Sequence, residues 1–169
     1  NPNTVRFWYE IEDAAKQTVE TGRPHSLRRV AFELWREWLV MLLPSGRKIY
    51  YHKPRVDTAI KFGRPKRVLS YRGKTKKGSW GDVQTYGGKL TENATQSIAR
   101  DILVHGMHRA DAAEMPVVLN VHDEIVSLVP EDSPRTHHDL STTITVMPSW
   151  AKGLPIGAEG FECEFYRKG

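Results

Sequence analysis

The stretch "PVVLNVHDEIVSLVPED", residues 116–132, places two apolar runs on either side of one charged triplet. The runs at 117–121 and 125–129 are apolar at successive positions, which predicts two short strands covered on both faces. The triplet His122-Asp123-Glu124 occupies the turn between them. A turn lifts side chains out of a sheet, so a carboxylate there is supported by packed strands and reachable by a ligand. Turns also favour Asp without any function, so the triplet alone does not establish a site.

Composition narrows the class of protein. The 169 residues are 39% hydrophobic and 9% aromatic, which is typical of a globular chain. The 25 Lys and Arg against 20 Asp and Glu give a net charge of +5, which favours an anionic partner such as nucleic acid. No apolar run approaches the roughly 20 residues of a membrane span, and the first residues do not resemble a signal peptide. The single cysteine, Cys163, excludes an intramolecular disulfide framework and a cysteine-based zinc site. The first residue is Asn1 rather than Met, which suggests a fragment or a processed product.

The first half of the chain predicts a helix followed by hairpin strands. Apolar residues recur at helical spacing within 3–20, and Gly22 and Pro24 end the pattern. Pro44-Ser45-Gly46 separates two apolar or aromatic runs, as expected for a reverse turn in a hairpin. Trp8, Trp35 and Trp38 are expected in the core rather than as stacking platforms for bases.

A basic segment follows at 61–77. It contains eight Lys or Arg residues and no acid, and is interrupted by Phe62, Tyr71 and several glycines. We expect an exposed, partly flexible segment with a short strand at 67–71. It could lie along DNA phosphates or be a solvated face, and both interpretations stay open.

The second half predicts a long helix before the opening hairpin. Thr91 is a suitable helix cap, and a small or apolar stripe follows: Ala94, Ile98, Ile102, Gly106 and Ala110. Asn93, Gln96 and Arg100 share a polar face of this helix. Ser133-Pro134 predicts the start of a further helix, and residues 161–166 a final strand. His137 and His138 are expected to be solvent-exposed rather than to bind metal. Helices and hairpins without regular alternation predict an α+β fold with an antiparallel sheet.

Several stretches resemble family A DNA polymerases, the polymerase I type and its phage relatives. Residues 117–132 are similar to the third conserved motif, in which a His-Asp-Glu triplet lies at the tip of a hairpin in the palm. The stretch "TYGGKLTENATQSIARDIL", residues 85–103, resembles the preceding helix. Residues 38–51 and 148–168 also resemble phage-type members, so the resemblance covers most of the chain.

The resemblance implies two-metal nucleotidyl transfer with Mg²⁺. Asp123 would be one of the shared metal-binding carboxylates, Glu124 a nearby acid that tunes the site, and His122 a contact to the primer terminus. Lys89, Asn93, Gln96 and Arg100 would face primer-template DNA, where minor-groove acceptors allow contact without sequence preference. Deoxynucleoside triphosphates would be the other partner, in the cytoplasm of a bacterial or phage-infected cell.

Two elements of that family are missing from the sequence. No Asp-Tyr pair provides the first carboxylate motif, and no helix carries the Arg and Lys that bind the triphosphate. Arg72, Lys76 and Tyr86 imitate that helix, but Gly73, Gly78 and Gly81 argue against a helix there. We expect residues 1–35 to be a helical segment at the fingers/palm junction and 36–169 the C-terminal palm portion. The missing N-terminal portion would be a partner, and the isolated chain would be inactive.

Alternative functions stay open from the sequence. The chain could be a basic DNA-binding module without catalysis, or a palm-like subunit of a split polymerase. A metal-dependent nuclease using Asp123 with an unidentified acid is the third alternative. Each predicts a different response of DNA to Mg²⁺ and to substitution of Asp123.

Overall fold

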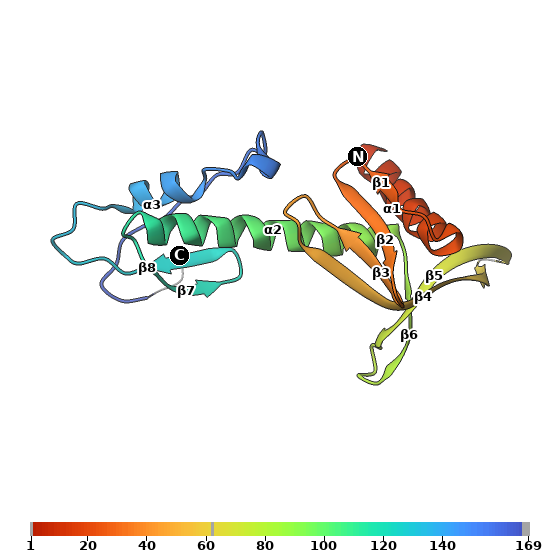
Figure 1. Ribbon diagram of the computed structural model, residues 1–169. Coiled ribbons are helices and arrows are strands. Elements are labelled where there is room, and N and C mark those ends of the chain that lie inside the picture. The colour runs from red at the N-terminus through yellow and green to blue at the C-terminus, as the bar shows by residue number, and fades with distance from the viewer. Residues whose placement is uncertain (1, 62, 167–169) are drawn as a thin grey trace. The chain divides into compact units, whose positions relative to one another are not determined.

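The computed structural model describes residues 2–61 and 63–166, apart from the side chain of residue 61 (Figure 1). The chain divides into two compact units, Asn1–Ser97 and Ile98–Gly169, which are described separately. The expected boundary after residue 35 lies at a turn between two strands of the first unit. None of the described helices is long and apolar enough to cross a membrane.

The first helix, α1 (Pro2–Thr21), confirms the prediction from the N-terminal spacing. Ile11 and Ala15 are completely buried on it, whereas Trp8 is 41% exposed, so the expectation that Trp8 lies in the core was wrong. The helix ends at Gly22, whose φ of +71° lets its amide bond the Thr18 carbonyl oxygen at 3.0 Å. Glycine favours this left-handed conformation at a helix C-terminus because it has no Cβ.

Six antiparallel strands follow in chain order and form one sheet. They are β1 (His25–Leu27), β2 (Val30–Trp35), β3 (Trp38–Leu42), β4 (Lys48–Lys61), β5 (Arg64–Lys74) and β6 (Trp80–Thr85). Helix α1 contacts β1 to β5, and the buried residues of the sheet include Phe32, Leu39, Met41, Tyr51 and Leu69. The antiparallel sheet with separate helices confirms the α+β prediction.

The predicted hairpin at Pro44-Ser45-Gly46 is confirmed as the β3–β4 connection. The Leu43 amide bonds the Arg47 carbonyl oxygen, and the Gly46 amide bonds the Leu43 carbonyl oxygen, both at 2.9 Å. Gly46 has a φ of +86°, a conformation that tight turns need and glycine adopts without steric cost. The turn fixes which residues of β3 and β4 face each other.

The basic segment is more ordered than the sequence predicted. The expected short strand at 67–71 belongs to the eleven-residue strand β5, which lies between β4 and β6. Val68, Leu69 and Ser70 are buried within it, so strand pairing outweighs the charge of the flanking residues. Phe62 lies outside the described residues. The β5–β6 hairpin also confirms that no helix forms around Gly73, Gly78 and Gly81.

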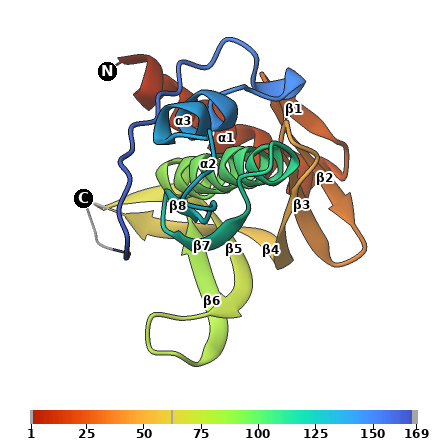
Figure 2. The ribbon, with the colours of Figure 1, turned by 90° about the vertical axis from the view of Figure 1, so that its left-hand side faces the viewer.

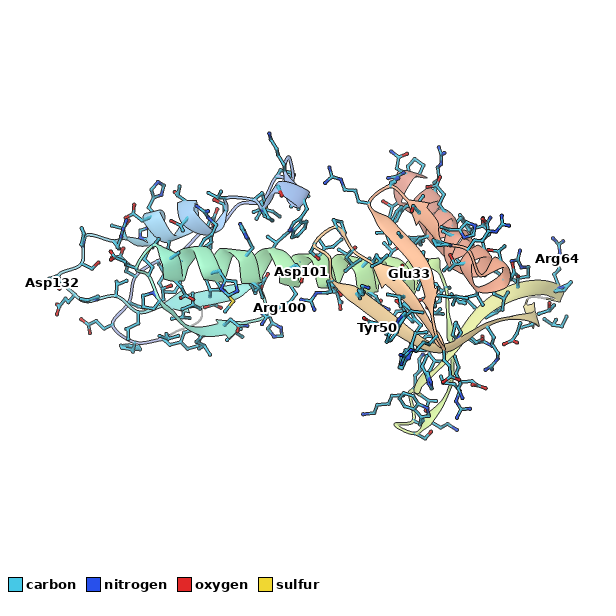
Figure 3. All side chains as sticks on the ribbon, in the orientation of Figure 1. Glu33, Tyr50, Arg64, Arg100, Asp101 and Asp132 are labelled. Atoms are coloured by element: carbon cyan, nitrogen blue, oxygen red, sulfur yellow. The ribbon has the colours of Figure 1, made fainter. Side chains whose placement is uncertain are left out.

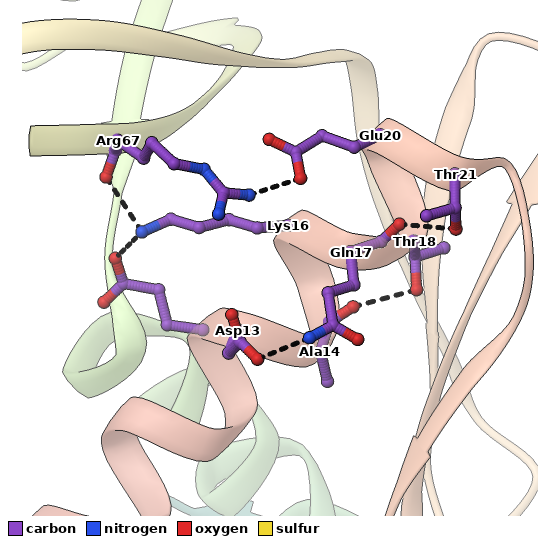
Figure 4. A network of polar contacts seen from close by, with 9 residues as sticks. Asp13, Ala14, Lys16, Gln17, Thr18, Glu20, Thr21 and Arg67 are labelled. Carbon is purple, nitrogen blue, oxygen red and sulfur yellow. Dashed lines mark hydrogen bonds and ion pairs between the residues drawn. The ribbon is translucent and has the colours of Figure 1, made fainter.

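A polar network ties α1 to β5 and to the start of the next helix, α2 (Gly87–Ala112) (Figure 4). Lys16, only 8% exposed, donates from Nζ to Glu12 Oε1 at 2.5 Å and to the Arg67 carbonyl oxygen at 2.8 Å. Glu12 Oε2 accepts from the Gly87 amide at 2.9 Å, and the Arg67 guanidinium pairs with Glu20. Burial would raise the pKa of Glu12, but the hydrogen bonds from Lys16 and Gly87 hold it below its usual value.

Gly87 is the point of closest approach between α1 and α2. A Cβ there would lie 1.8 Å from the carbonyl oxygen of Trp8, so only glycine fits against the α1 backbone. The predicted cap at Thr91 was wrong, because the helix starts at Gly87 and the Leu90 amide already bonds the Tyr86 carbonyl oxygen at 3.0 Å. The predicted buried stripe is largely confirmed at Ala94, Ile102, Gly106 and Ala110.

The second unit contains the hairpin of β7 (Val117–Val121) and β8 (Glu124–Ser127), helix α3 (His137–Ile144) and the short 3₁₀ helix η1 (Ser149–Ala151). The predicted hairpin is confirmed, but the expectation that its strands are covered on both faces was wrong. Val118 is 58% and Leu119 42% exposed, because the described residues provide these two strands with no third strand.

Two predicted boundaries in this unit were wrong. Helix α3 starts at His137 rather than at Ser133-Pro134, because Thr136 and Asp139 form a capping box. The Thr136 amide donates to Asp139 Oδ2 at 2.9 Å, and the Asp139 amide donates to Thr136 Oγ1 at 3.3 Å. Residues 161–166 form no strand, and 167–169 lie outside the described residues.

Candidate functional site

The His122-Asp123-Glu124 triplet lies at the tip of the β7–β8 hairpin, as predicted. Val121 faces Glu124 across the hairpin, so His122 and Asp123 form the two-residue turn and Glu124 begins β8. His122 has a φ of +54°, in the left-handed region that such turns require. Residues other than glycine adopt this conformation at a cost of order 1–3 kcal/mol. The backbone therefore presents His122 and Asp123 at the exposed end of two strands.

The base of this hairpin is fixed to the end of α2. Asp111 Oδ1 accepts a hydrogen bond from the Val117 amide at 2.8 Å. Ser127 Oγ donates to the Met115 carbonyl oxygen at 3.0 Å, and Met115 is buried. These contacts position the strands while leaving the tip open. The arrangement suits a carboxylate that must keep its place before a ligand arrives.

Asp123 and Glu124 provide the right ligand atoms for Mg²⁺ but not a complete set. Within residues 2–61 and 63–166, no group of three His, Cys, Asp or Glu side chains could hold a metal. Mg²⁺ is often held by one or two carboxylates together with substrate phosphates and waters. The exposed Asp123 and half-buried Glu124 fit that partial role, with oxygen ligands and no cation paired to them among the described residues.

The predicted DNA-facing residues of α2 divide into two groups. Gln96 and Arg100 are exposed, in agreement with a surface role. Lys89 Nζ donates to Glu92 Oε1 at 2.8 Å, and this hydrogen bond raises the pKa of Lys89. Asn93 is half-buried, and its Nδ2 donates to the Tyr51 hydroxyl at 3.1 Å. The Asn93 amide is therefore engaged with the sheet in this structure.

Tyr51 is the buried partner in that contact. It is 3% exposed, and burial raises its pKa to about 12, although the hydrogen bond from Asn93 acts in the opposite direction. Its ring meets Tyr71 edge to face, with ring centroids 5.1 Å apart. Tyr51 and Asn93 thus link α2 to the core of the first unit.

The basic residues of the sheet are partly neutralised by acids. Arg55 bonds Asp82 through two nitrogens, at 3.0 and 2.8 Å, and Asp57 at 2.9 Å. Arg72 lies 3.6 Å from Asp82, and the hydrogen bond from Arg55 is the main cause that lowers the pKa of Asp82. Lys74, Lys76 and Lys77, at the β5–β6 turn, pair with no acid among the described residues.

Aromatic side chains gather on the same sheet, contrary to the expectation of core tryptophans. Trp35 is 50% exposed and Trp38 half-buried, and both contact the ring of Tyr50, which is labelled in Figure 3. The strand alternation around the β3–β4 turn could have indicated this, because Tyr50 and His52 share a face opposite that of the buried Tyr51.

His137 and His138 are exposed, as expected, and the neighbouring acids have local partners. His137 receives Glu162, which accepts from its amide at 2.9 Å and lies 3.1 Å from Nδ1. Asp139 completes the capping box of α3. These contacts account for the group without a metal.

One comparison with known proteins gives a match. The chain is 40% identical over 172 aligned positions to a DNA polymerase of Bacillus phage SP02. The alignment covers 99% of this chain but 26% of the phage protein, so the chain spans about a quarter of that relative's length. No protein-family model and no solved structure matches the chain. The similarity supports the interpretation of this chain as part of a DNA polymerase.

Proposed function

We propose that this chain is the C-terminal palm portion of a family A, phage-like DNA polymerase. The observation that carries the proposal is the β7–β8 hairpin, whose turn holds Asp123 exposed at a fixed base, in a chain similar to a phage DNA polymerase along nearly its whole length. The chain would supply one carboxylate motif to template-directed nucleotidyl transfer.

The three residues of the turn would have different roles. Asp123, at the exposed tip, would bind Mg²⁺ together with a carboxylate from another part of the polymerase. Glu124, half-buried at the start of β8, would adjust the negative potential around Asp123. His122 would contact the primer terminus. Bound Mg²⁺ would supply the positive charge that activates the primer hydroxyl and stabilises the leaving pyrophosphate.

Helix α2 would contact the primer-template duplex. Gln96 can exchange hydrogen bonds with the minor groove, whose acceptors occur in every base pair, and Arg100 adds positive charge. Lys89 would contribute after exchanging Glu92 for a phosphate or base. Asn93 would have to leave Tyr51 to reach DNA, so we propose it as a supporting residue that holds α2 on the sheet.

The rest of a polymerase would provide what this chain lacks. The described residues hold two neighbouring carboxylates at the hairpin but no cluster of three acids. The second metal-binding carboxylate and the cations for the triphosphate would come from a preceding portion. The isolated chain would therefore bind primer-template DNA without extending it.

Primer extension tests this proposal. The longest natural polypeptide that contains this chain should extend a labelled primer with Mg²⁺ and deoxynucleoside triphosphates, whereas the isolated 169-residue chain should not. Robust synthesis by the isolated chain would contradict the proposed division of the active site. No synthesis by the longer polypeptide would contradict the polymerase role.

A second candidate is a non-catalytic DNA-binding module or a palm-like subunit of a split polymerase. The lack of a three-acid cluster among the described residues and the net charge of +5 favour it. It predicts duplex binding that is independent of Mg²⁺ and unaffected by Asp123→Asn. A nuclease would instead shorten labelled DNA in Mg²⁺ and lose this activity in the same variant.

A further inference from the structure

Five ring side chains form a row across the six-stranded sheet. This aromatic row consists of Trp35 on β2, Trp38 on β3, Tyr50 and His52 on β4, and Trp80 on β6. Successive ring centroids lie 4.5 to 6.5 Å apart, and the closest pair is Trp38 with His52. Side chains from four strands therefore form one continuous surface.

The strand register places the aromatic row on the face of the sheet that α1 does not cover. Trp38 pairs directly with His52, and His52 with Arg72, so these side chains share one face. Phe32, Leu39 and Tyr51 belong to the other face and are buried. Figures 1 and 2 both show the β5–β6 hairpin, which carries Trp80, extending away from α1.

The rings of the aromatic row are unusually accessible for their size. Trp80 is 63%, Trp35 50% and Tyr50 47% exposed. Folding alone does not require such large rings on a solvent-facing surface, and a contiguous exposed aromatic surface is typical of an interaction site. Its edges determine which partner is favoured.

Positive charge borders the aromatic row at both ends. The Arg36 guanidinium lies 4.9 Å from the centre of the Trp35 ring. Lys74 faces Trp80 across the β5–β6 ladder, and Lys76 and Lys77 follow in the adjoining turn. None of these four cations has an acidic partner among the described residues. In contrast, the acids on nearby strands are paired, Glu33 with Lys48 and Glu37 with Lys53.

We propose that the aromatic row binds single-stranded DNA, with bases on the rings and phosphates beside the flanking cations. Exposed aromatic rings bordered by Lys and Arg are the pattern with which proteins hold unpaired strands without sequence preference. The identification of that strand as the unpaired template rests on the proposed polymerase function, whereas the stacking itself does not. A protein segment that covers the row is the rival occupant, and the charge at both ends favours the nucleic acid.

Fluorescence anisotropy with the 169-residue chain tests the inference. The probe is a labelled oligothymidylate of about 12 nucleotides, within the range of roughly 4–16 nucleotides for such sites. Trp80→Ala and Tyr50→Ala should each weaken binding about 5- to 150-fold, the loss expected for one stacked base. Trp80→Phe should restore most of the affinity because it keeps an aromatic ring.

A matched control is Tyr9→Ala. Tyr9 is 68% exposed but lies on α1, outside the aromatic row, and its loss should leave the affinity unchanged. Circular dichroism would show that each variant keeps the wild-type fold. Lys76→Gln and Lys77→Gln should each reduce the slope of log affinity against log salt by about 0.7.

Two results would overturn the inference. One is no measurable binding of the oligonucleotide by the wild-type chain, and the other is equal affinity of the wild type, Trp80→Ala and Tyr50→Ala. Either result would favour a protein segment as the occupant of the aromatic row. Asp123→Asn should not change single-strand affinity, so failure of this inference is distinguishable from failure of the polymerase proposal.

Discussion

The side-chain amide of Asn93 on α2 donates a hydrogen bond to the buried hydroxyl of Tyr51 on β4, at 3.1 Å. The contact lies within the first unit and joins its helix to its sheet. The polymerase resemblance assigned Asn93 to DNA, whereas this geometry gives it a partner in the protein. The two roles lead to different effects of substitution.

Asn93→Ala should destabilise the first unit. The Tyr51 hydroxyl would lose its partner while it remains 3% exposed, and an unsatisfied buried group costs about 1–3 kcal/mol. Urea denaturation measures the change in the free energy of unfolding. Combining Asn93→Ala with Tyr51→Phe should recover much of this loss. An Asn93→Ala variant with wild-type stability and weakened DNA binding would support the DNA role instead.

Gly87→Ala should be strongly destabilising. The new methyl group would lie 1.8 Å from the Trp8 carbonyl oxygen, and the backbone of α1 cannot move aside as a flexible side chain can. Overpacking of this kind costs about 1–3 kcal/mol or more. Gly157→Ala is the control, because a Cβ at Gly157 would meet nothing within 4 Å. Equal melting temperatures for the two variants would contradict the close packing of α1 against α2.

The Glu12–Lys16 pair should make stability depend on pH. The pKa of Glu12 is lower in the folded protein than its usual value of 4.5, so the carboxylate stabilises the fold above that pH. Its contribution is lost as pH falls through the lower, folded-state pKa. Glu12→Gln should therefore be less stable than wild type at neutral pH, and the difference should shrink in acid. A difference that stays constant down to about pH 3 would contradict this linkage.

Arg100→Gln should weaken duplex binding without loss of stability. The side chain is exposed on α2, and removal of one phosphate contact lowers the slope of log affinity against log salt by about 0.9. Gln96→Ala should weaken binding with little change in that slope, because an uncharged amide releases no counterion. Arg23→Gln, an exposed arginine between α1 and β1, serves as the control. Unchanged affinity in both α2 variants would remove this helix from the DNA interface.

Local sequence patterns predicted most of the elements. The spacing of Ile11 and Ala15 indicated α1, and the apolar runs around His122-Asp123-Glu124 indicated the β7–β8 hairpin. These predictions succeeded because one period or one turn determines the element. The α+β class followed from the order of helices and hairpins.

Features that depend on distant partners were missed. Thr91 has the chemistry of a cap, but the contact of Gly87 with Glu12 and Trp8 starts α2 one turn earlier. Trp35 has the composition of a core residue, but its strand turns that ring to the uncovered face of the sheet. The polar partner of Asn93 was also inaccessible to sequence, because Tyr51 lies 42 residues away.

Primer extension by the longest natural polypeptide that contains this chain, with Asp123→Asn, tests the central claim most directly. The control is Asp132→Asn, another exposed acid of the second unit, labelled in Figure 3. We predict that Asp123→Asn abolishes Mg²⁺-dependent extension while Asp132→Asn and the wild type extend the primer equally. Undiminished extension by Asp123→Asn would show that this residue binds no catalytic metal and would contradict the proposed role of the hairpin.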